Sequence, residues 1–180
     1  GLSVATGAGI FGAQAVVYLA DTVPEAFAQR LREKGADVVR AGAIYEEAMA
    51  QAMADAEANG WQLVSDSSWD GYLEIPATIM RGYCVMAQEL AESFRKDASW
   101  PSHVFLQAGV GGLAGAVAAH IRAHWDEQPA IVVVEPDRAP CLKASAAKGQ
   151  IVRADGDVSN MGRLDCKEPS LIAFGVRSML

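Results

Sequence analysis

The feature that most constrains this chain is the alternation of short apolar runs with longer helical patterns. Apolar runs of strand length cover residues 15–19, 37–40, 62–65, 104–107 and 130–134. Apolar residues at helical spacing cover residues 24–34, 44–59, 76–94, 113–125 and 140–147. Strands that alternate with helices build βαβ units, in which neighbouring strands are parallel. The sequence therefore predicts an α/β fold with mainly parallel sheets and flanking helices.

Composition excludes several classes of protein. The chain has 180 residues, a formal net charge of −7 and 51% hydrophobic residues. An acidic chain is a poor match for nucleic acid or an anionic membrane surface, and this apolar fraction is enough for a packed core. The 3 cysteines contain no CxxC pair, which is typical of a reducing compartment. We therefore expect a cytoplasmic protein that binds neither nucleic acid nor membrane.

The amino-terminal stretch up to Ala20 is uncharged and mostly apolar, so a targeting or membrane segment has to be considered. The first cation is Arg30, which leaves no basic region of the kind that opens a signal peptide. Gly7, Gly9 and Gly12 interrupt the apolar run. We expect a buried helix of small residues followed by a buried strand.

A glycine-rich turn between a strand and a helix is the clearest chemical motif. The strand of residues 104–107 leads into the sequence GVGG at 109–112, and the next helix begins at Leu113. Glycines let backbone amides approach an anion closely, and a helix amino terminus adds partial positive charge. Because the turn holds no Lys or Arg, the amides themselves would bind the ligand. The motif predicts a site for a phosphate ester, and its alternative is a tight turn that serves packing alone.

The same residues fit a second phosphate-binding pattern. Gly109, Gly111 and Ala114 match the GxGxxA form of the dinucleotide fingerprint, and Glu135 ends the following strand, where a ribose-binding carboxylate would lie. However, the motif follows a late strand of the chain, whereas the fingerprint belongs to the first βα turn. A nicotinamide-dependent oxidoreductase therefore stays as the alternative from a different class.

Asp66 is the candidate catalytic residue. It follows the apolar run at 62–65, and ligands of open α/β sheets bind outside the carboxyl ends of strands. A carboxylate there could act as a general acid or base, or pair with a substrate ammonium group. The sequence Asp-Ser-Ser is also typical of turns, so a purely structural role is the alternative.

His120 and His124 lie one helical turn apart and could in principle bind a metal ion. The residues between them lack the glutamate of the catalytic HExxH pattern. We therefore interpret the pair as part of a solvated helix face and expect no metal site.

Several longer segments together resemble a known family. These segments are SDSSWDGY at 65–72, IPATIMRGY at 75–83, LQAGVGGLAG at 106–115, VVEPD at 133–137, and GDVSNM and LDCKEPS within 156–170. The chain resembles the fold-type II pyridoxal-phosphate enzymes, whose fold is that of the tryptophan synthase β subunit, and within them the diaminopropionate ammonia-lyases. The resemblance covers nearly the whole chain and fades over its last residues.

The resemblance implies an architecture of two lobes with open, mainly parallel sheets. Residues 1–10 and 71–180 would belong to the large, cofactor-holding lobe, and residues 11–70 to the small lobe. The family's Schiff-base lysine would precede Gly1, so the large lobe would be incomplete and the 180-residue chain alone inactive. The resemblance also implies a homodimer.

The implied cofactor is pyridoxal 5'-phosphate, and the implied reaction converts 2,3-diaminopropionate to pyruvate and ammonia by α,β-elimination. A serine/threonine dehydratase-like enzyme is the alternative within the same class. Asp66 matches the family's active-site aspartate on the substrate side. The residues that match its phosphate-binding loop are Gly109, Val110, Gly111, Gly112 and Leu113.

Overall fold

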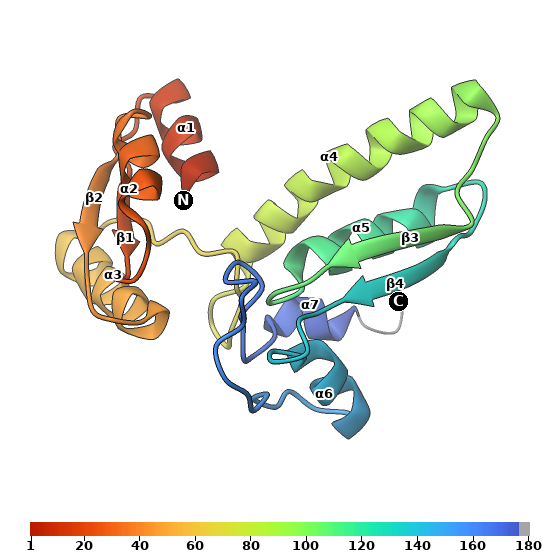
Figure 1. Cartoon of the computed structure of the whole chain (residues 1–180). Helices are drawn as coiled ribbons and strands as arrows, with labels where there is room; N and C mark the ends of the chain where they lie inside the picture. Colours follow the sequence, from red (N-terminus) through yellow and green to blue (C-terminus); the bar gives the residue numbers. More distant parts are fainter. Residues whose placement is uncertain (177–180) are drawn as a thin grey trace. The chain divides into compact units, whose positions relative to one another are not determined.

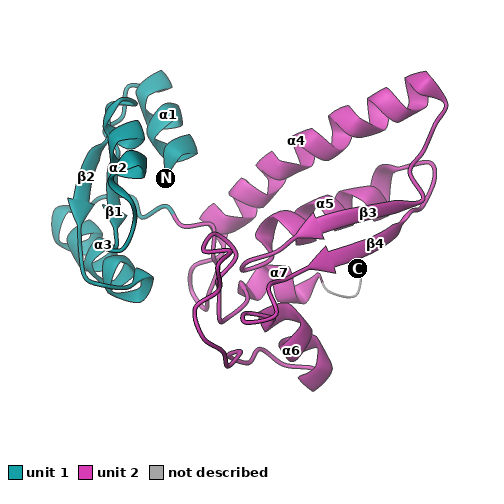
Figure 2. Ribbon diagram, in the orientation of Figure 1, with its two compact units in different colours: residues 1–64 teal, residues 65–180 magenta. Residues whose placement is uncertain are grey.

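The computed structural model describes residues 1–176. The chain divides into two compact units, Gly1–Val64 and Ser65–Leu180, which Figure 2 shows in different colours. Each unit has its own sheet and its own hydrophobic core. We therefore describe each unit by itself.

Unit 1 is a small α/β unit built on two parallel strands. Its helices are α1 (Leu2–Ile10), α2 (Glu25–Arg32) and α3 (Tyr45–Asn59), and its strands are β1 (Val16–Leu19) and β2 (Asp37–Arg40). Val16 pairs with Asp37 and Leu19 with Arg40. Ala5, Ala15, Leu31 and Ala36 form the buried core, in which small side chains let α1 and α2 pack closely.

Unit 2 carries the glycine-rich turn. It consists of α4 (Glu74–Asp97), β3 (His103–Gln107), α5 (Gly112–His124), β4 (Ala130–Val134), α6 (Cys141–Lys148) and α7 (Leu171–Gly175). β3 and β4 are parallel, with His103 opposite Ala130 and Gln107 opposite Val134. In Figure 1, α4 runs along α5, and α5 leads back from the carboxyl end of β3 to the start of β4. This is the βαβ unit that the alternation predicts.

The core of unit 2 lies between α4, α5 and the sheet. α5 is buried along almost its whole length because it consists mainly of alanine, glycine and valine, which leave room for close neighbours. Phe94 and Trp100 each pack against the Trp125 ring, with centroids 5.4 Å and 5.5 Å away. The Trp125 indole N–H donates to the carbonyl of Ala87 on α4 (3.1 Å), so this buried polar group is satisfied.

Two expectations about elements were wrong. Residues 62–65 form no strand. Val64 is 42% exposed, and none of the strands within residues 1–176 lies alongside to supply the hydrogen bonds that a strand requires. α1 is a helix, as expected, but only Ala5 of its residues is buried, because one side alone meets the unit 1 core. The sequence also missed α7, which is too short for a helical period to be visible.

The lobe boundaries expected from the resemblance remain a prediction about a complete two-lobed enzyme. Within this chain, α1 packs against α2 of unit 1, and the division between the units falls between Val64 and Ser65. The segment from Ser65 to Asp70, which contains Asp66, therefore groups with the phosphate-loop unit. Among the described residues, no helix combines the length and the apolarity that crossing a membrane would require.

Candidate functional site

Gly111 gives the glycine-rich turn its shape. Its φ of +94° lies in the region that only glycine adopts readily, and it forms the amino-terminal cap of α5. A Cβ atom built at Gly111 would lie 2.8 Å from Cδ1 of Leu142 and 3.1 Å from Cβ of Ala173. Both the backbone conformation and the packing of α6 and α7 behind the turn therefore require glycine here.

The turn presents amides that no helix hydrogen bond uses. The first amides of a helix, here those of Gly112, Leu113 and Ala114, have no acceptor within the helix. They lie at the positive end of the dipole of α5, a helix of 13 residues. A ligand with several oxygen acceptors and negative charge, such as a phosphate ester, fits this set of donors.

The back of the turn is fixed at two carbonyls. The Ser170 amide donates to the Val110 carbonyl (2.9 Å), and the Cys141 thiol donates to the Gly109 carbonyl (3.4 Å). Ser170 is fully buried, and so is Cys141. Because the carbonyls are held from behind, the amides of the turn keep a fixed direction.

Asp66 lies beside this turn. A Cβ atom built at Gly112 would be 3.6 Å from the Asp66 carbonyl oxygen, so the Asp66 backbone passes close to the start of α5. The Asp66 residue itself is exposed, and the segment around it is braced by Tyr72, whose hydroxyl accepts a hydrogen bond from the Ser65 amide (2.9 Å). The Tyr72 ring stacks on Trp69 with centroids 4.3 Å apart. The structure thus brings together the catalytic candidate and the phosphate-binding candidate.

Burial and the negative charge of Asp66 raise the pKa values of two nearby tyrosines, Tyr72 and Tyr83. Burial raises the pKa of the Tyr83 phenol, and the Asp66 carboxylate raises it further. The pKa of Tyr72 is raised for the same two reasons, although its bond with the Ser65 amide acts in the opposite direction. Both phenols therefore keep their protons over the ordinary pH range and can donate hydrogen bonds near Asp66.

Glu135 has a structural role that the dinucleotide alternative did not foresee. Its carboxylate accepts hydrogen bonds from the amides of Leu142 (2.7 Å) and Lys143 (2.9 Å), in the first turn of α6. A carboxylate at that place satisfies helix amides that lack an acceptor and interacts well with the helix dipole. Glu135 is thus engaged in holding α6 and is not presented to a ribose.

His120 is less exposed than expected, whereas His124 is exposed as expected. His120 is half-buried, its Nε2 atom has no hydrogen-bond partner among the described residues, and its ring centroid lies 4.6 Å from that of His124. Burial lowers the pKa of His120, and the neighbouring His124 lowers it further. The interpretation of His120 as part of a solvated face was therefore wrong.

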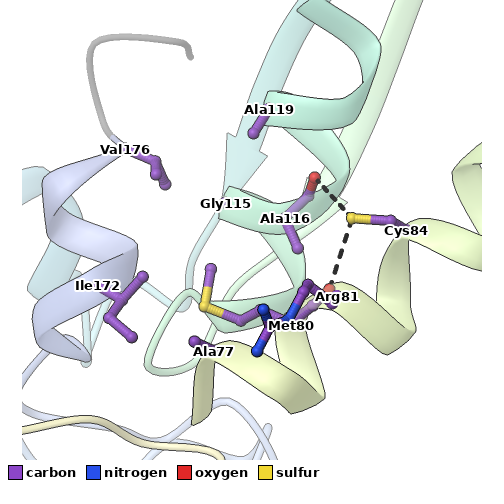
Figure 3. A pocket seen from close by; sticks show the side chains of 9 residues that line it. All are labelled: Ala77, Met80, Arg81, Cys84, Gly115, Ala116, Ala119, Ile172 and Val176. Atoms are coloured by element: carbon purple, nitrogen blue, oxygen red, sulfur yellow. Dashed lines mark hydrogen bonds between the residues drawn. The ribbon is translucent and has the colours of Figure 1, made fainter. Parts of the chain in front are cut away.

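An apolar groove lies behind the turn, between α4, α5 and α7. Figure 3 shows the side chains that line it, and the Cys84 thiol on α4 donating to the carbonyls of Met80 (3.6 Å) and Ala116 (3.7 Å). Close packing shapes this region, since a Cβ at Gly115 would lie 2.6 Å from Cγ2 of Val176. Its lining contains one charged residue, Arg81, and does not suit an amino acid substrate.

Comparison with known proteins decides the family. A model of the pyridoxal-phosphate dependent enzymes matches residues 1–178. The chain belongs to this family. Membership agrees with the glycine-rich turn, and it leaves the nicotinamide alternative without support.

Similar members of the family point to one branch. The chain is 38% identical to diaminopropionate ammonia-lyase of Salmonella typhimurium over 181 residues and 34% identical to that of Escherichia coli K12 over 178 residues, covering 98% of this chain and 45% of each relative. A crystal structure of the Escherichia coli enzyme superposes with a TM-score of 0.90 at 32% identity, over 97% of this chain and 44% of that one. The human serine dehydratase-like protein is 31% identical over 153 residues, or 84% of this chain and 43% of the relative. The chain thus spans less than half the length of these relatives.

Two residues of the site region escaped the sequence analysis. Ser68 and Ser170 are both buried and meet through their hydroxyl groups, 2.6 Å apart, although they belong to distant segments. Serine in a polar segment is a common turn residue, so composition and spacing gave no signal for this contact.

Proposed function

We propose that this chain is the cofactor-holding part of a pyridoxal 5'-phosphate-dependent lyase that converts 2,3-diaminopropionate to pyruvate and ammonia. The observation that carries the proposal is the close approach of the Asp66 segment to the glycine-rich turn, in a chain similar to diaminopropionate ammonia-lyases along 98% of its length. This approach would bring a charged side chain close to the place where the cofactor would bind.

The proposed phosphate site is the turn from Gly109 to Leu113, with Val110, Gly111 and Gly112 between them. The φ of Gly111 supports this assignment, and so do the amides at the start of α5, which have no acceptor within the helix. The cofactor, when bound, withdraws electrons from the substrate Cα and so makes its proton acidic. The task of these residues is to hold the phosphate so that the reactive end of the cofactor lies in a fixed place.

Asp66 is proposed as the catalytic residue that serves the substrate's β-amino group. As a carboxylate, it would attract the β-ammonium group; as a protonated acid, it could return a proton to the departing nitrogen. The phenols of Tyr72 and Tyr83, whose pKa values the Asp66 charge raises, are donors that could orient this carboxylate or the substrate.

The dehydratase alternative differs in the leaving group. A serine or threonine substrate loses a hydroxyl group, which has no positive charge for Asp66 to attract. The alternative is favoured by the similarity to the human serine dehydratase-like protein. It is weaker than the first proposal because the ammonia-lyases are more similar and cover more of the chain.

An assay of substrates separates the two activities. The full-length natural protein, supplied with pyridoxal 5'-phosphate, is incubated with 2,3-diaminopropionate, serine or threonine, and the 2-oxo acid formed is measured through coupled NADH oxidation. We expect 2,3-diaminopropionate to have the largest kcat/KM. A protein that turns over serine or threonine but leaves 2,3-diaminopropionate untouched is a dehydratase, and one that acts on none refutes both proposals.

We also propose a cytoplasmic homodimer. The odd number of cysteines and the absence of a CxxC pair support a reducing compartment. The dimer rests on the resemblance to the family alone. Sedimentation of the full-length natural protein measures it directly.

A further inference from the structure

We propose that Ser68 and Ser170 form a buried hydroxyl clasp that holds the Asp66 segment against the phosphate turn, so that both are positioning residues for one active site. This inference rests on the proposed function for its consequence, since the clasp matters to catalysis only if the turn holds the cofactor. The contacts themselves all lie within unit 2.

In the clasp, the hydroxyl of each serine accepts a hydrogen bond from a backbone amide of the other segment. Ser170 occupies the amino-terminal cap of α7, yet its side chain makes no bond with its own helix. Its Oγ instead accepts a hydrogen bond from the Ser68 amide (3.0 Å). In return, the Ser68 Oγ accepts from the Ile172 amide in the first turn of α7 (2.9 Å). Each serine therefore satisfies an amide that the other segment leaves open.

Two further bonds close the contact. The two Oγ atoms are 2.6 Å apart and share a hydrogen bond, and the Leu171 amide donates to the Ser68 carbonyl (2.9 Å). Ser170 is 0% exposed and Ser68 is 4% exposed, so water cannot replace a lost partner. Loss of the Ser170 hydroxyl would leave the buried Ser68 amide without its acceptor, and loss of the Ser68 hydroxyl would do the same to the part-buried Ile172 amide. Leaving such an amide without an acceptor costs more than the bond itself contributes.

Each end of the clasp reaches one part of the proposed site. On one side, the Ser170 amide donates to the Val110 carbonyl of the phosphate turn (2.9 Å). On the other side, Ser68 follows Asp66 in the same segment, and the Asp66 carbonyl passes close to Gly112. Hydrogen bonds therefore link the buried Ser68, two residues after the exposed Asp66, through Ser170 to the half-buried Val110. Movement of the segment would therefore also move the turn.

The distinguishing experiment measures cofactor affinity in a variant of Ser68, whose hydroxyl bonds to Ser170 and to the Ile172 amide, both outside the turn. In the full-length natural protein, Ser68→Ala is expected to weaken pyridoxal 5'-phosphate binding to the apoprotein about five- to tenfold, the loss typical of one or two buried hydrogen bonds. Ser170→Ala should have a similar effect. The double variant should weaken binding less than the product of the two single effects, because each substitution removes the same contact between the two hydroxyl groups.

Ser145→Ala is the matched control. Ser145 is also 0% exposed, and its Oγ donates to the Val152 carbonyl (3.2 Å) and accepts from the Val152 amide (3.0 Å), but it makes no contact with Ser68. This variant should keep cofactor affinity within about twofold of the wild type. Circular dichroism confirms folding, and if Ser170→Ala does not fold, Ser68→Ala carries the test.

The outcomes separate the two proposals. If the wild-type protein binds pyridoxal 5'-phosphate but folded Ser68→Ala binds it equally well, the clasp is overturned and the proposed function stands. Equal losses in Ser68→Ala and Ser145→Ala also overturn it, because the effect would then be general destabilisation. If the wild type binds no pyridoxal 5'-phosphate, the proposed function and the clasp fall together.

Discussion

Burial determines the chemistry of the Cys141 thiol. The side chain is 0% exposed, and burial, followed by the neighbouring Glu135 charge, raises the pKa of Cys141 to about 12. Since only the thiolate is nucleophilic, Cys141 should remain unreactive near neutral pH. Its hydrogen bond to the Gly109 carbonyl is then a permanent part of the turn.

We predict that iodoacetamide at pH 8 alkylates Cys141 slower than Cys84 by about two orders of magnitude or more, because Cys84 is only half-buried. Peptide mass mapping over time measures both rates. In guanidinium chloride the two rates should become similar. Rapid labelling of Cys141 in the folded protein would contradict both its burial and its raised pKa.

Asp66 gives a prediction about leaving groups. In the full-length natural protein, Asp66→Asn should lower turnover of 2,3-diaminopropionate by about two orders of magnitude, the usual scale of acid–base assistance. Any turnover of serine should fall less, since serine has no β-ammonium group. Asp70→Asn, which changes another exposed aspartate of the same segment, is the control and should retain activity. Similar, small losses on both substrates would assign Asp66 to the turn alone.

His120 gives a prediction about pH. Its pKa in the folded chain lies below the ordinary value of 6.5, so the unfolded chain binds more protons when the pH falls below that value. The contribution of His120 to stability is therefore complete above pH 6.5 and is lost as the pH falls. Thermal unfolding between pH 8 and pH 5.5 should show a smaller decrease for His120→Leu than for the wild type. Parallel curves would mean that His120 titrates alike in both states.

At the scale of elements, the junction of β3 and α5 depends on Gly111. Its left-handed backbone and the nearby Leu142 side chain predict that Gly111→Ala destabilises the protein by about 1–3 kcal/mol. The shift of the turn should also weaken binding of pyridoxal 5'-phosphate about tenfold. Gly162→Ala is the control, because a Cβ there meets no atom within 4 Å. Denaturant unfolding and cofactor titration measure the two effects, and a Gly111→Ala protein with native stability would contradict the structure.

The elements differ in how far the sequence could predict them. α5 and β4 were predicted almost to the residue, because periodic apolar residues and a glycine turn mark their ends. Residues 62–65 have the same apolar character but lack a neighbouring strand, and pairing is a property of the fold that local pattern does not contain.

In the candidate site, too, the sequence predicts a motif of neighbouring residues but not the contacts between distant segments. The phosphate turn is a continuous motif and was predicted from the residues alone. The resemblance supplied the role of Asp66, while the contact of its segment with Gly112 emerged only from the structure. The engagement of Glu135 with α6 was missed for the same reason, since its partners lie beyond a turn.

At the scale of the whole molecule, the two units are joined by a segment without regular structure. Residues 61–65 belong to no helix or strand, and Trp61 is 48% exposed. We predict that brief chymotrypsin treatment of the 180-residue chain cuts after Trp61, because an exposed and irregular backbone fits a protease site. Mass spectrometry should find residues 1–61 and 62–180 as the major products. Trp61→Gln should slow this cut, and preferential cleavage within α4 or α5 would contradict the division.

The clasp also has a consequence for the order in which unit 2 folds. Ser68 and Ser170 are separated by 102 positions along the chain, and closing so long a loop has a large entropic cost. α4 forms through local contacts and the βαβ unit through contacts of intermediate range, so both can precede the clasp. A newly made chain would then acquire its helices and sheet first and its cofactor-binding geometry last. During synthesis, that final step must wait until Ser170 has left the ribosome.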